Sequence, residues 1–254
     1  MKMWLWIFLL CSSLSAAFAQ DVAKVAKLIA VQGDVKAFGG GQKERFLSRG
    51  SDIFLHDTLV VAEGSTAQLK FTDGGLMTLI ASTQFSIDSY HFNTPGQKDE
   101  SVSSLAKGGF RAVSGSISKS NPDNYEVKTP SATIGLRGTT FDIHVLGQEV
   151  YCGCTKGMIE VVNSAGRIRI GKSAPVQFAY IPSPNDKPIA LPERPPELSP
   201  QTFSPPPGGH SLQGERVLGA EGPGPGSISP PALESTSTPN QPQVIISDQR
   251  NGCE

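Results

Sequence analysis

The chain has 254 residues, with 22 Lys and Arg against 23 Asp and Glu and a formal net charge of −1 at pH 7. Residues 20–181 carry 17 basic against 15 acidic side chains, and residues 182–254 carry 4 against 8. This balance, without a basic stripe interleaved with aromatic residues, excludes a nucleic-acid-binding surface. We therefore expect no nucleic-acid partner.

The first residues have the pattern of a signal peptide. A short positive start precedes an apolar run from Trp4 to Leu14, and Ala17-Phe18-Ala19 gives a small-x-small cleavage pattern. We expect cleavage after Ala19 and a periplasmic or secreted mature chain. No later segment is apolar over the roughly 20 residues that a membrane span needs, so we expect no span after cleavage. Lipidation at Cys11 is the alternative, and the large Leu10 before it disfavours it.

Short runs of alternating apolar and polar residues follow, which is the pattern of half-buried β-strands. The runs expected to form strands are Val25–Val31, Val35–Phe38, Thr58–Val61, Thr66–Thr72, Leu76–Ile80, Gln84–Tyr90, Tyr125–Thr129, Thr140–Val145, Val150–Val162 and Gly166–Gly171. Turns such as Asp73-Gly74 separate them, and only Ser101–Lys107 has mild helical character. We predict a single all-β domain of short strands, solenoid-like or sandwich-like, over residues 20–181.

The composition changes after Ile181. Sixteen of the 20 prolines lie beyond that residue, and Phe203 is the only aromatic residue there. Such a segment cannot bury enough apolar surface to offset the entropy lost on ordering. We therefore expect residues 182–254 to be a disordered Pro/Gly-rich tail.

Three cysteines remain after signal cleavage: Cys152, Cys154 and Cys253. Strand alternation puts Cys152 and Cys154 on one face, so a bridge between them would need a bulge at Gly153. An oxidising compartment permits a redox pair at these two positions or a structural bridge to Cys253, and two unpaired thiols are the third interpretation. The sequence has no four-cysteine or Cys/His zinc spacing.

Patterns that carry catalysis are missing from the sequence. The four histidines, His56, His91, His144 and His210, are scattered, and no paired-carboxylate or Gly-x-Ser-x-Gly motif occurs. His144 alternates with Ile143 and Val145, so we expect it on the solvent side of a strand. We expect no catalytic, cofactor-binding or metal-binding residues and no enzymatic activity.

The chain is organised around the stretch from Tyr125 to Val145. Pro130 cannot donate to a β-ladder and belongs at a strand end or edge. Gly135 and Gly138 supply positive φ or a close backbone approach. If Gly138 has positive φ, its replacement by Val should lower the melting temperature.

The sequence of this stretch resembles the signature of the FecR domain family. The resemblance singles out Thr129, Pro130, Gly135, Arg137, Gly138, Thr139 and Phe141. Further pieces in the family's order are Val31–Val35, Gly50–Asp52, Asp57–Leu69, Phe71–Gly75, Leu105–Gly109 and Lys156–Val161, so the resemblance spans about residues 28–178. It implies an all-β, solenoid-like periplasmic module.

In the best-known members of that family, the module receives a signal from an outer-membrane iron-siderophore transporter and passes it through a membrane helix to a sigma-factor regulator. Here a cleavable signal leads almost directly into the domain. We therefore expect a stand-alone periplasmic FecR-domain protein without the cytoplasmic anti-sigma domain or the membrane helix. The resemblance implies a non-enzymatic protein-interaction or signalling module, with an outer-membrane receptor or inner-membrane sensor as its partner. The alternative is a protein that binds cell-envelope glycan or peptidoglycan.

Overall fold

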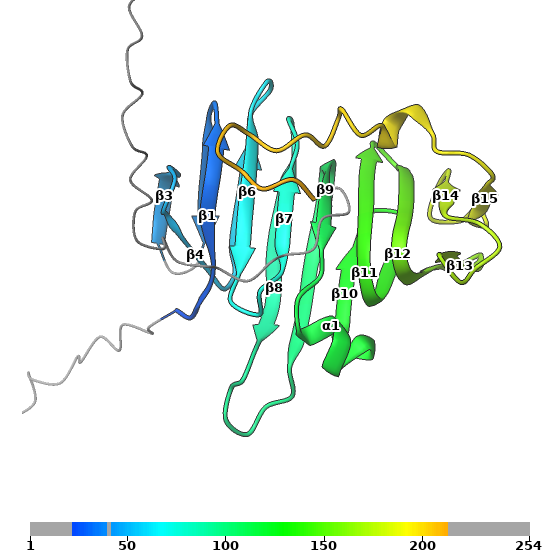
Figure 1. Ribbon diagram of the computed structural model, residues 1–254, viewed down its shortest axis with the longest axis horizontal. Coiled ribbons are helices and arrows are strands. Elements are labelled where there is room, and N and C mark those ends of the chain that lie inside the picture. The colour runs from blue at the N-terminus through cyan, green and yellow to red at the C-terminus, as the bar shows by residue number, and fades with distance from the viewer. Residues whose placement is uncertain (1–21, 40–41, 213–254) are drawn as a thin grey trace, which may run out of the picture. The chain divides into compact units, whose positions relative to one another are not determined.

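In the computed structural model, residues 22–39 and 42–212 form a 15-stranded sheet with almost no helix (Figure 1). The strands are β1 Lys24–Gln32, β2 Val35–Gly39, β3 Gln42–Phe46, β4 Asp52–Phe54, β5 Asp57–Val61, β6 Thr66–Phe71, β7 Leu76–Leu79, β8 Gln84–His91, β9 Glu100–Val113, β10 Tyr125–Lys128, β11 Thr133–Leu146, β12 Glu149–Asn163, β13 Gly166–Gly171, β14 Phe178–Ile181 and β15 Ile189–Leu191. The helical pieces are α1 Ile117–Ser120, η1 Pro122–Asn124 and η2 Pro196–Leu198. The all-β prediction is confirmed, while the expected signal peptide, residues 1–19, lies outside the described residues.

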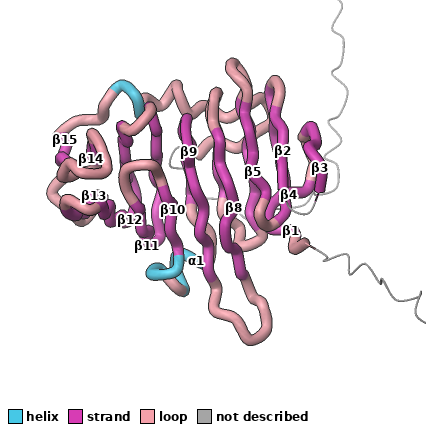
Figure 2. The backbone as a smooth tube through the Cα atoms, turned by 180° about the vertical axis from the view of Figure 1, so that it is seen from behind, coloured by secondary structure: helices cyan, strands magenta, loops and turns pink. Residues whose placement is uncertain are grey.

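The strands lie in two layers, seen from opposite sides in Figures 1 and 2. The front layer contains β1, β4, β6, β7, β14 and β15, and the back layer contains β2, β3, β5, β8, β10 and β13. The long strands β9, β11 and β12 take part in both layers. The first part of β9, for example, pairs with β8 and β10, and its last part pairs with β7 and with the second half of β11.

A glycine marks the point where each long strand changes layer. Gly108 in β9, Gly138 in β11 and Gly157 in β12 have φ values of +74°, +58° and +79°. A side chain with a Cβ atom is disfavoured at such φ values, whereas glycine adopts them readily. These three glycines therefore let the chain bend from one layer into the other without strain.

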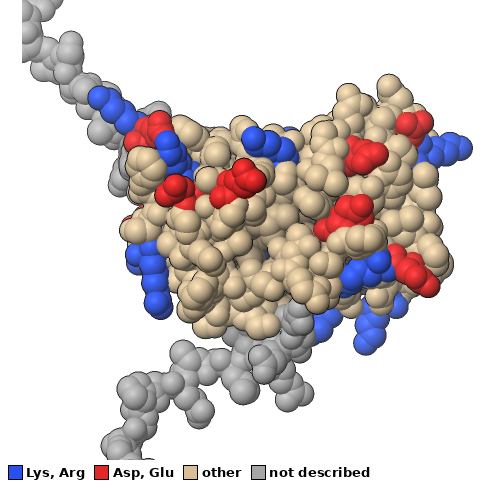
Figure 3. All heavy atoms as spheres, turned by 90° about the horizontal axis from the view of Figure 1, so that it is seen from above, with Lys and Arg blue, Asp and Glu red and all other residues tan. Residues whose placement is uncertain are grey.

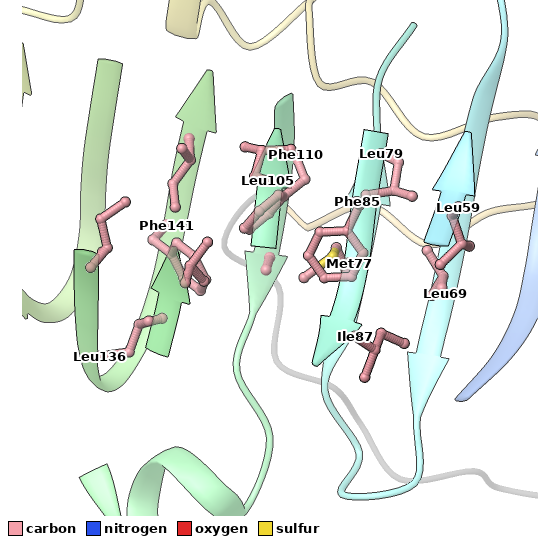
Figure 4. Close-up of a cluster of buried hydrophobic side chains, with 14 of the residues drawn as sticks. Leu59, Leu69, Met77, Leu79, Phe85, Ile87, Leu105, Phe110, Leu136 and Phe141 are labelled. Atoms are coloured by element: carbon pink, nitrogen blue, oxygen red, sulfur yellow. The ribbon is translucent and has the colours of Figure 1, made fainter. Parts of the chain in front are cut away.

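The main hydrophobic core lies between the layers (Figure 4). Phe85 of β8, Phe110 of β9 and Phe141 of β11 form a row of edge-to-face rings, with centroid distances of 5.6 and 5.5 Å. Each of the three side chains is at most 1% exposed. Burial of a phenylalanine contributes about 1.5–3 kcal/mol, so this row holds the two layers together.

Two details differ from the sequence-based expectations. Ser101–Lys107, which had mild helical character, belongs to strand β9, and Ser101, Ser103 and Leu105 alternate into the interior. Solenoid stacking is not confirmed, since every strand pairing within the described residues is antiparallel except that of β10 with β9. Within that same part of the chain, no helix has the length and apolar character needed to cross a membrane.

The expected tail boundary at Ile181 is wrong for residues 182–212. β15 pairs with β14, and residues 194–212, which we call the strap, cross in front of the front layer (Figure 1). The strap side chains Leu198, Phe203 and Leu212 are 0%, 2% and 6% exposed. A few spaced apolar residues anchor an extended segment on an existing sheet, although the segment has no core of its own. Residues 213–254 lie outside the described residues.

Candidate functional site

Four of the signature residues have positions that the fold itself explains. The Thr129 hydroxyl donates to the carbonyl of Ala132 at 2.8 Å and accepts from its N–H at 3.1 Å, which closes the turn between β10 and β11. Pro130 lies inside this turn, Gly138 at the bend of β11, and Phe141 in the core. These residues shape the domain.

Gly135 has no comparable structural requirement. Its φ is not positive, and a Cβ atom added there would meet no atom within 4 Å. Gly135 forms part of the floor of a hollow of about 190 Å³ on the outer surface of the back layer. The hollow is lined by Pro122, Asp123, Glu126, Thr133, Gly135, Leu136, Arg137, Met158, Glu160, Val162 and Arg169. Glycine at position 135 keeps this floor open.

The strand register places the central lining residues in one row. Gly135 pairs with Glu126 on one side and with Glu160 on the other, and Glu160 pairs with Arg169. The row therefore crosses four strands, β10 to β13. It brings together side chains that are far apart in the sequence and of both charge signs.

Two ion pairs form the walls of the hollow. Arg137 lies 3.0 Å from Asp123, and Arg169 lies 3.0 Å from Glu160. The side chains of Arg137 and Asp123 are 60% and 83% exposed. Exposed ion pairs contribute only about 0–1 kcal/mol, so a binding partner could exchange them for its own charged groups at little cost.

The β13 edge runs beside the hollow. In the described part of the chain, β13 pairs only with β12, so its other side has no hydrogen-bonded strand, although β14 and β15 lie near it. Arg167 and Arg169 point to solvent from this strand. An unpaired strand edge can accept an extended segment of another chain through backbone hydrogen bonds. The hollow and the β13 edge therefore form one continuous candidate surface.

On the face seen in Figure 3, acidic and basic side chains are interspersed among uncharged ones. Within residues 22–39 and 42–212, no group of three or more His, Cys, Asp or Glu side chains has the arrangement to hold a metal ion.

Cys152 and Cys154 both face the main core from β12 and are free thiols. Burial raises the pKa of Cys152 far above its ordinary value and that of Cys154 to about 12. Because the thiolate is the reactive form, these pKa values disfavour a redox role. Cys253 lies outside the described residues, so a bridge to it stays a prediction.

The sequence did not predict a buried ion cluster on the outer surface of the front layer. Asp142 of β11 accepts from Arg111 of β9 at 2.6 and 2.9 Å, and from Arg194 of the strap at 2.9 Å. His144, expected in solvent, lies under the strap with Nδ1 3.1 Å from the Glu197 carbonyl oxygen. Strand alternation placed His144 on the outer side, opposite Ile143 and Val145, but it carries no information about a segment that covers that side.

Comparison with known proteins finds a family similarity in the central part of the chain. Residues 57–160 match the family model described as FecR protein. This stretch of the chain is similar to FecR proteins. Two crystal structures, both titled as a "putative anti-sigma factor from Parabacteroides distasonis ATCC 8503", share 15% and 16% sequence identity with TM-scores of 0.42 and 0.41. Each alignment covers 53% of this chain and 58% of the other, so the chain spans less than two thirds of their length. No curated protein matches the sequence.

The FecR match confirms the resemblance and supports a signalling or regulatory module. It includes Asp123, Gly135, Arg137 and Glu160 of the hollow. Arg169, the β13 edge and the strap lie beyond the matched residues. The floor of the candidate surface thus lies within the residues that match the FecR model, and its outer edge lies in the residues that follow them.

Proposed function

We propose that this protein is a non-enzymatic periplasmic signalling module that binds another envelope protein through the hollow and the β13 edge. The observation that carries the proposal is the floor of the hollow. Gly135 lies within the FecR match, needs glycine neither for its φ nor for packing, and keeps a surface open between two exchangeable ion pairs.

The surface favours a protein partner of a particular kind. Its floor presents backbone, and its walls present both carboxylates and guanidinium groups, so a complementary partner carries both charge signs. The edge of β13 adds backbone donors and acceptors for an extended strand of that partner. An outer-membrane receptor or an inner-membrane sensor is the class of partner that the FecR resemblance implies.

A periplasmic location is supported by the apolar run from Trp4 to Leu14 and by the cleavage pattern that ends at Ala19. Cell fractionation together with the mass of the mature N-terminus tests it. We expect the protein in the periplasmic fraction with Gln20 as its first residue. An uncleaved chain in the cytoplasmic fraction would refute this part of the proposal.

Site-specific photo-crosslinking in cells tests the binding surface. The full chain carries a photo-reactive amino acid in place of Arg167, which is exposed on β13, or in place of Phe46, which is 69% exposed on β3 at the far end of the back layer. We expect one reproducible protein adduct from position 167 that is missing from position 46 and is weakened by Gly135→Gln.

Three results would contradict the proposal. Equal adducts from both positions would mean that the surface has no preferred partner. An adduct at position 167 that is insensitive to Gly135→Gln would remove the hollow from the interface. Recovery of glycan fragments without a protein would favour the envelope-glycan alternative.

A further inference from the structure

The strap rests on a hydrophobic cluster of its own. Leu198 and Phe203 of the strap pack with Ile80 and Phe178 of the body, and Tyr151 and Leu191 border them. This cluster lies on the outer surface of the front layer and is separate from the main core between the layers. The strap can therefore leave its position without opening the main core.

A single row of paired residues crosses the front layer beneath the strap. From β6 to β14 the register aligns Gln68, Thr78, Arg111, Asp142, Gly153 and Phe178. The four polar members of this row are at most 5% exposed. Buried polar groups are costly unless they are hydrogen-bonded. The strap covers these side chains and also supplies hydrogen-bond partners to Gln68 and Asp142.

The strap contacts this row at several points along its own sequence. Arg194 donates to Asp142 at 2.9 Å and stacks on Phe178, with 4.9 Å from Cζ to the ring centroid. Phe203 lies over Arg111, 5.0 Å from Cζ to the ring centroid. Leu198 of the strap lies close to Gly153, since a Cβ atom added at Gly153 would be 3.1 Å from Leu198 Cδ1.

The last contact point, which we call an anchor like the contacts of Arg194, Leu198 and Phe203, is between Gln68 and the backbone of the strap. Gln68 is 0% exposed; its Nε2 donates to the carbonyl of His210 at 2.7 Å, and its Oε1 accepts from the N–H of His210 at 2.6 Å. A further bond from Nε2 to the Thr78 hydroxyl, at 3.0 Å, fixes the amide. Such a pair of bonds holds an extended backbone whatever side chain the bound residue carries.

Two hollows adjoin the strap. A space of about 310 Å³ lies next to Arg111, Arg194 and Leu212, and another of about 270 Å³ lies next to Lys70, Gly208 and His210. Both spaces are open to solvent, so the strap is held at separate contact points and not along its whole length.

We propose that the outer surface of the front layer is a peptide-binding site that the strap occupies in cis. The partner is an extended, proline-containing segment of another protein, with an arginine, an aliphatic and an aromatic side chain in the order of Arg194, Leu198 and Phe203. Such a segment displaces the strap and takes its anchors. This site does not share residues with the hollow, so the proposal stands or falls independently of the proposed function.

A competing peptide must displace a strap that is tethered to the same chain. A tethered segment has an effective concentration on the order of 1 mM, so a free peptide competes poorly with an intact strap. Asp142 keeps its two bonds to Arg111 when Arg194 leaves, which avoids an unpaired buried carboxylate in the open state. The site is therefore available to a partner after the strap is weakened or outcompeted.

The test uses the full chain and a fluorescent peptide with the sequence of residues 192–212. The double variant Leu198→Ser, Phe203→Ser weakens the chain's own strap and leaves the front layer intact. We expect it to bind the peptide at least about tenfold more tightly than the unmodified chain, and we expect Gln68→Leu in the double variant to reduce that binding again. Phe46→Ser, the same change at an exposed phenylalanine, should behave like the unmodified chain.

The proposal is overturned if the double variant shows an unchanged melting transition of the body but binds the peptide no better than the unmodified chain. A concentration-dependent dimer that exchanges straps would assign the site to a second copy and overturn the choice of partner. Hydrogen exchange on the unmodified chain decides the case in which the double variant does not fold. We expect the strap amides, including that of His210, to exchange before those of β9 and β11. Exchange of the strap only together with those strands would refute a detachable strap.

Discussion

Alanine at Gly138 should destabilise the β-domain, whereas alanine at Gly135 in the same strand should not. Gly138 has φ +58°, a conformation that costs a residue with a Cβ atom about 1–2 kcal/mol. Its added Cβ would meet only Lys119 Cγ, at 3.9 Å, so steric overlap adds nothing. Gly135 has neither constraint. Both substitutions restrict the unfolded chain by the same about 0.4–1 kcal/mol, which cancels between them, so the difference between the variants isolates the backbone strain.

The assay is thermal unfolding of the two variants of the full chain, compared side by side. For a domain of this size 1 kcal/mol corresponds to roughly 2–4 °C, so Gly138→Ala should melt about 2–8 °C below Gly135→Ala. Gly138→Asn should recover part of the loss, because asparagine tolerates positive φ better than alanine. Equal melting temperatures for the two alanine variants would refute the conformational role of Gly138.

Three further predictions follow from buried groups. Asp142→Ala should cost about 3–5 kcal/mol in urea unfolding, because it leaves Arg111, whose side chain is 6% exposed, without its carboxylate, whereas Arg194→Ala should cost less since Asp142 stays paired. The thiols of Cys152 and Cys154 should resist a thiol reagent until the domain unfolds, because burial raises their pKa; fast labelling of the native protein would contradict their placement. Burial lowers the pKa of His144 below its ordinary value of 6.5, although the contact with Glu197 opposes this shift. The stability that neutral His144 contributes is therefore present above pH 6.5 and is lost as the pH falls through the lowered pKa. Melting temperatures measured between about pH 8 and pH 5 should fall less steeply in His144→Gln than in the unmodified chain.

Local alternation was sufficient to predict which side chains face the core. Ile143 and Val145, expected opposite the solvent-side His144, and Cys152 and Cys154, expected on one face, all point into the main core. This works because a strand's side-chain period is set by its backbone, whatever its neighbours are. The same rule failed for Ser101–Lys107. Serines occupy inward positions of β9 there, so the alternation of apolar and polar residues that marks a strand is missing from the sequence.

The sequence could not separate the roles of its two central glycines. Gly135 and Gly138 look alike in a strand-like run, but one keeps a surface open and the other allows a bend. The difference depends on what lies above each residue and on which strands pair on either side. Both are decided by long-range pairing of β11 with β9, β10 and β12.

The strap escaped prediction for a related reason. Proline content argues that a segment cannot build its own core, and residues 194–212 indeed build none. Their order comes from a polar row that spans β6 to β11 and from an apolar cluster that includes β14. The row could be recognised in the sequence only if the pairing of Gln68, Arg111 and Asp142 were already known.

The two candidate surfaces use opposite layers and different anchors. The hollow is built on the outer side of the back layer, and the strap site on the outer side of the front layer, and no described residue lines both. Substitutions at distant sites without shared partners usually add within about 0.3–0.5 kcal/mol. Gly135→Gln and Phe203→Ser should therefore affect stability additively, with the first acting on crosslinking at position 167 and the second on peptide binding. A marked departure from additivity would mean that the bent strands β9, β11 and β12, which run through both layers, couple the two surfaces.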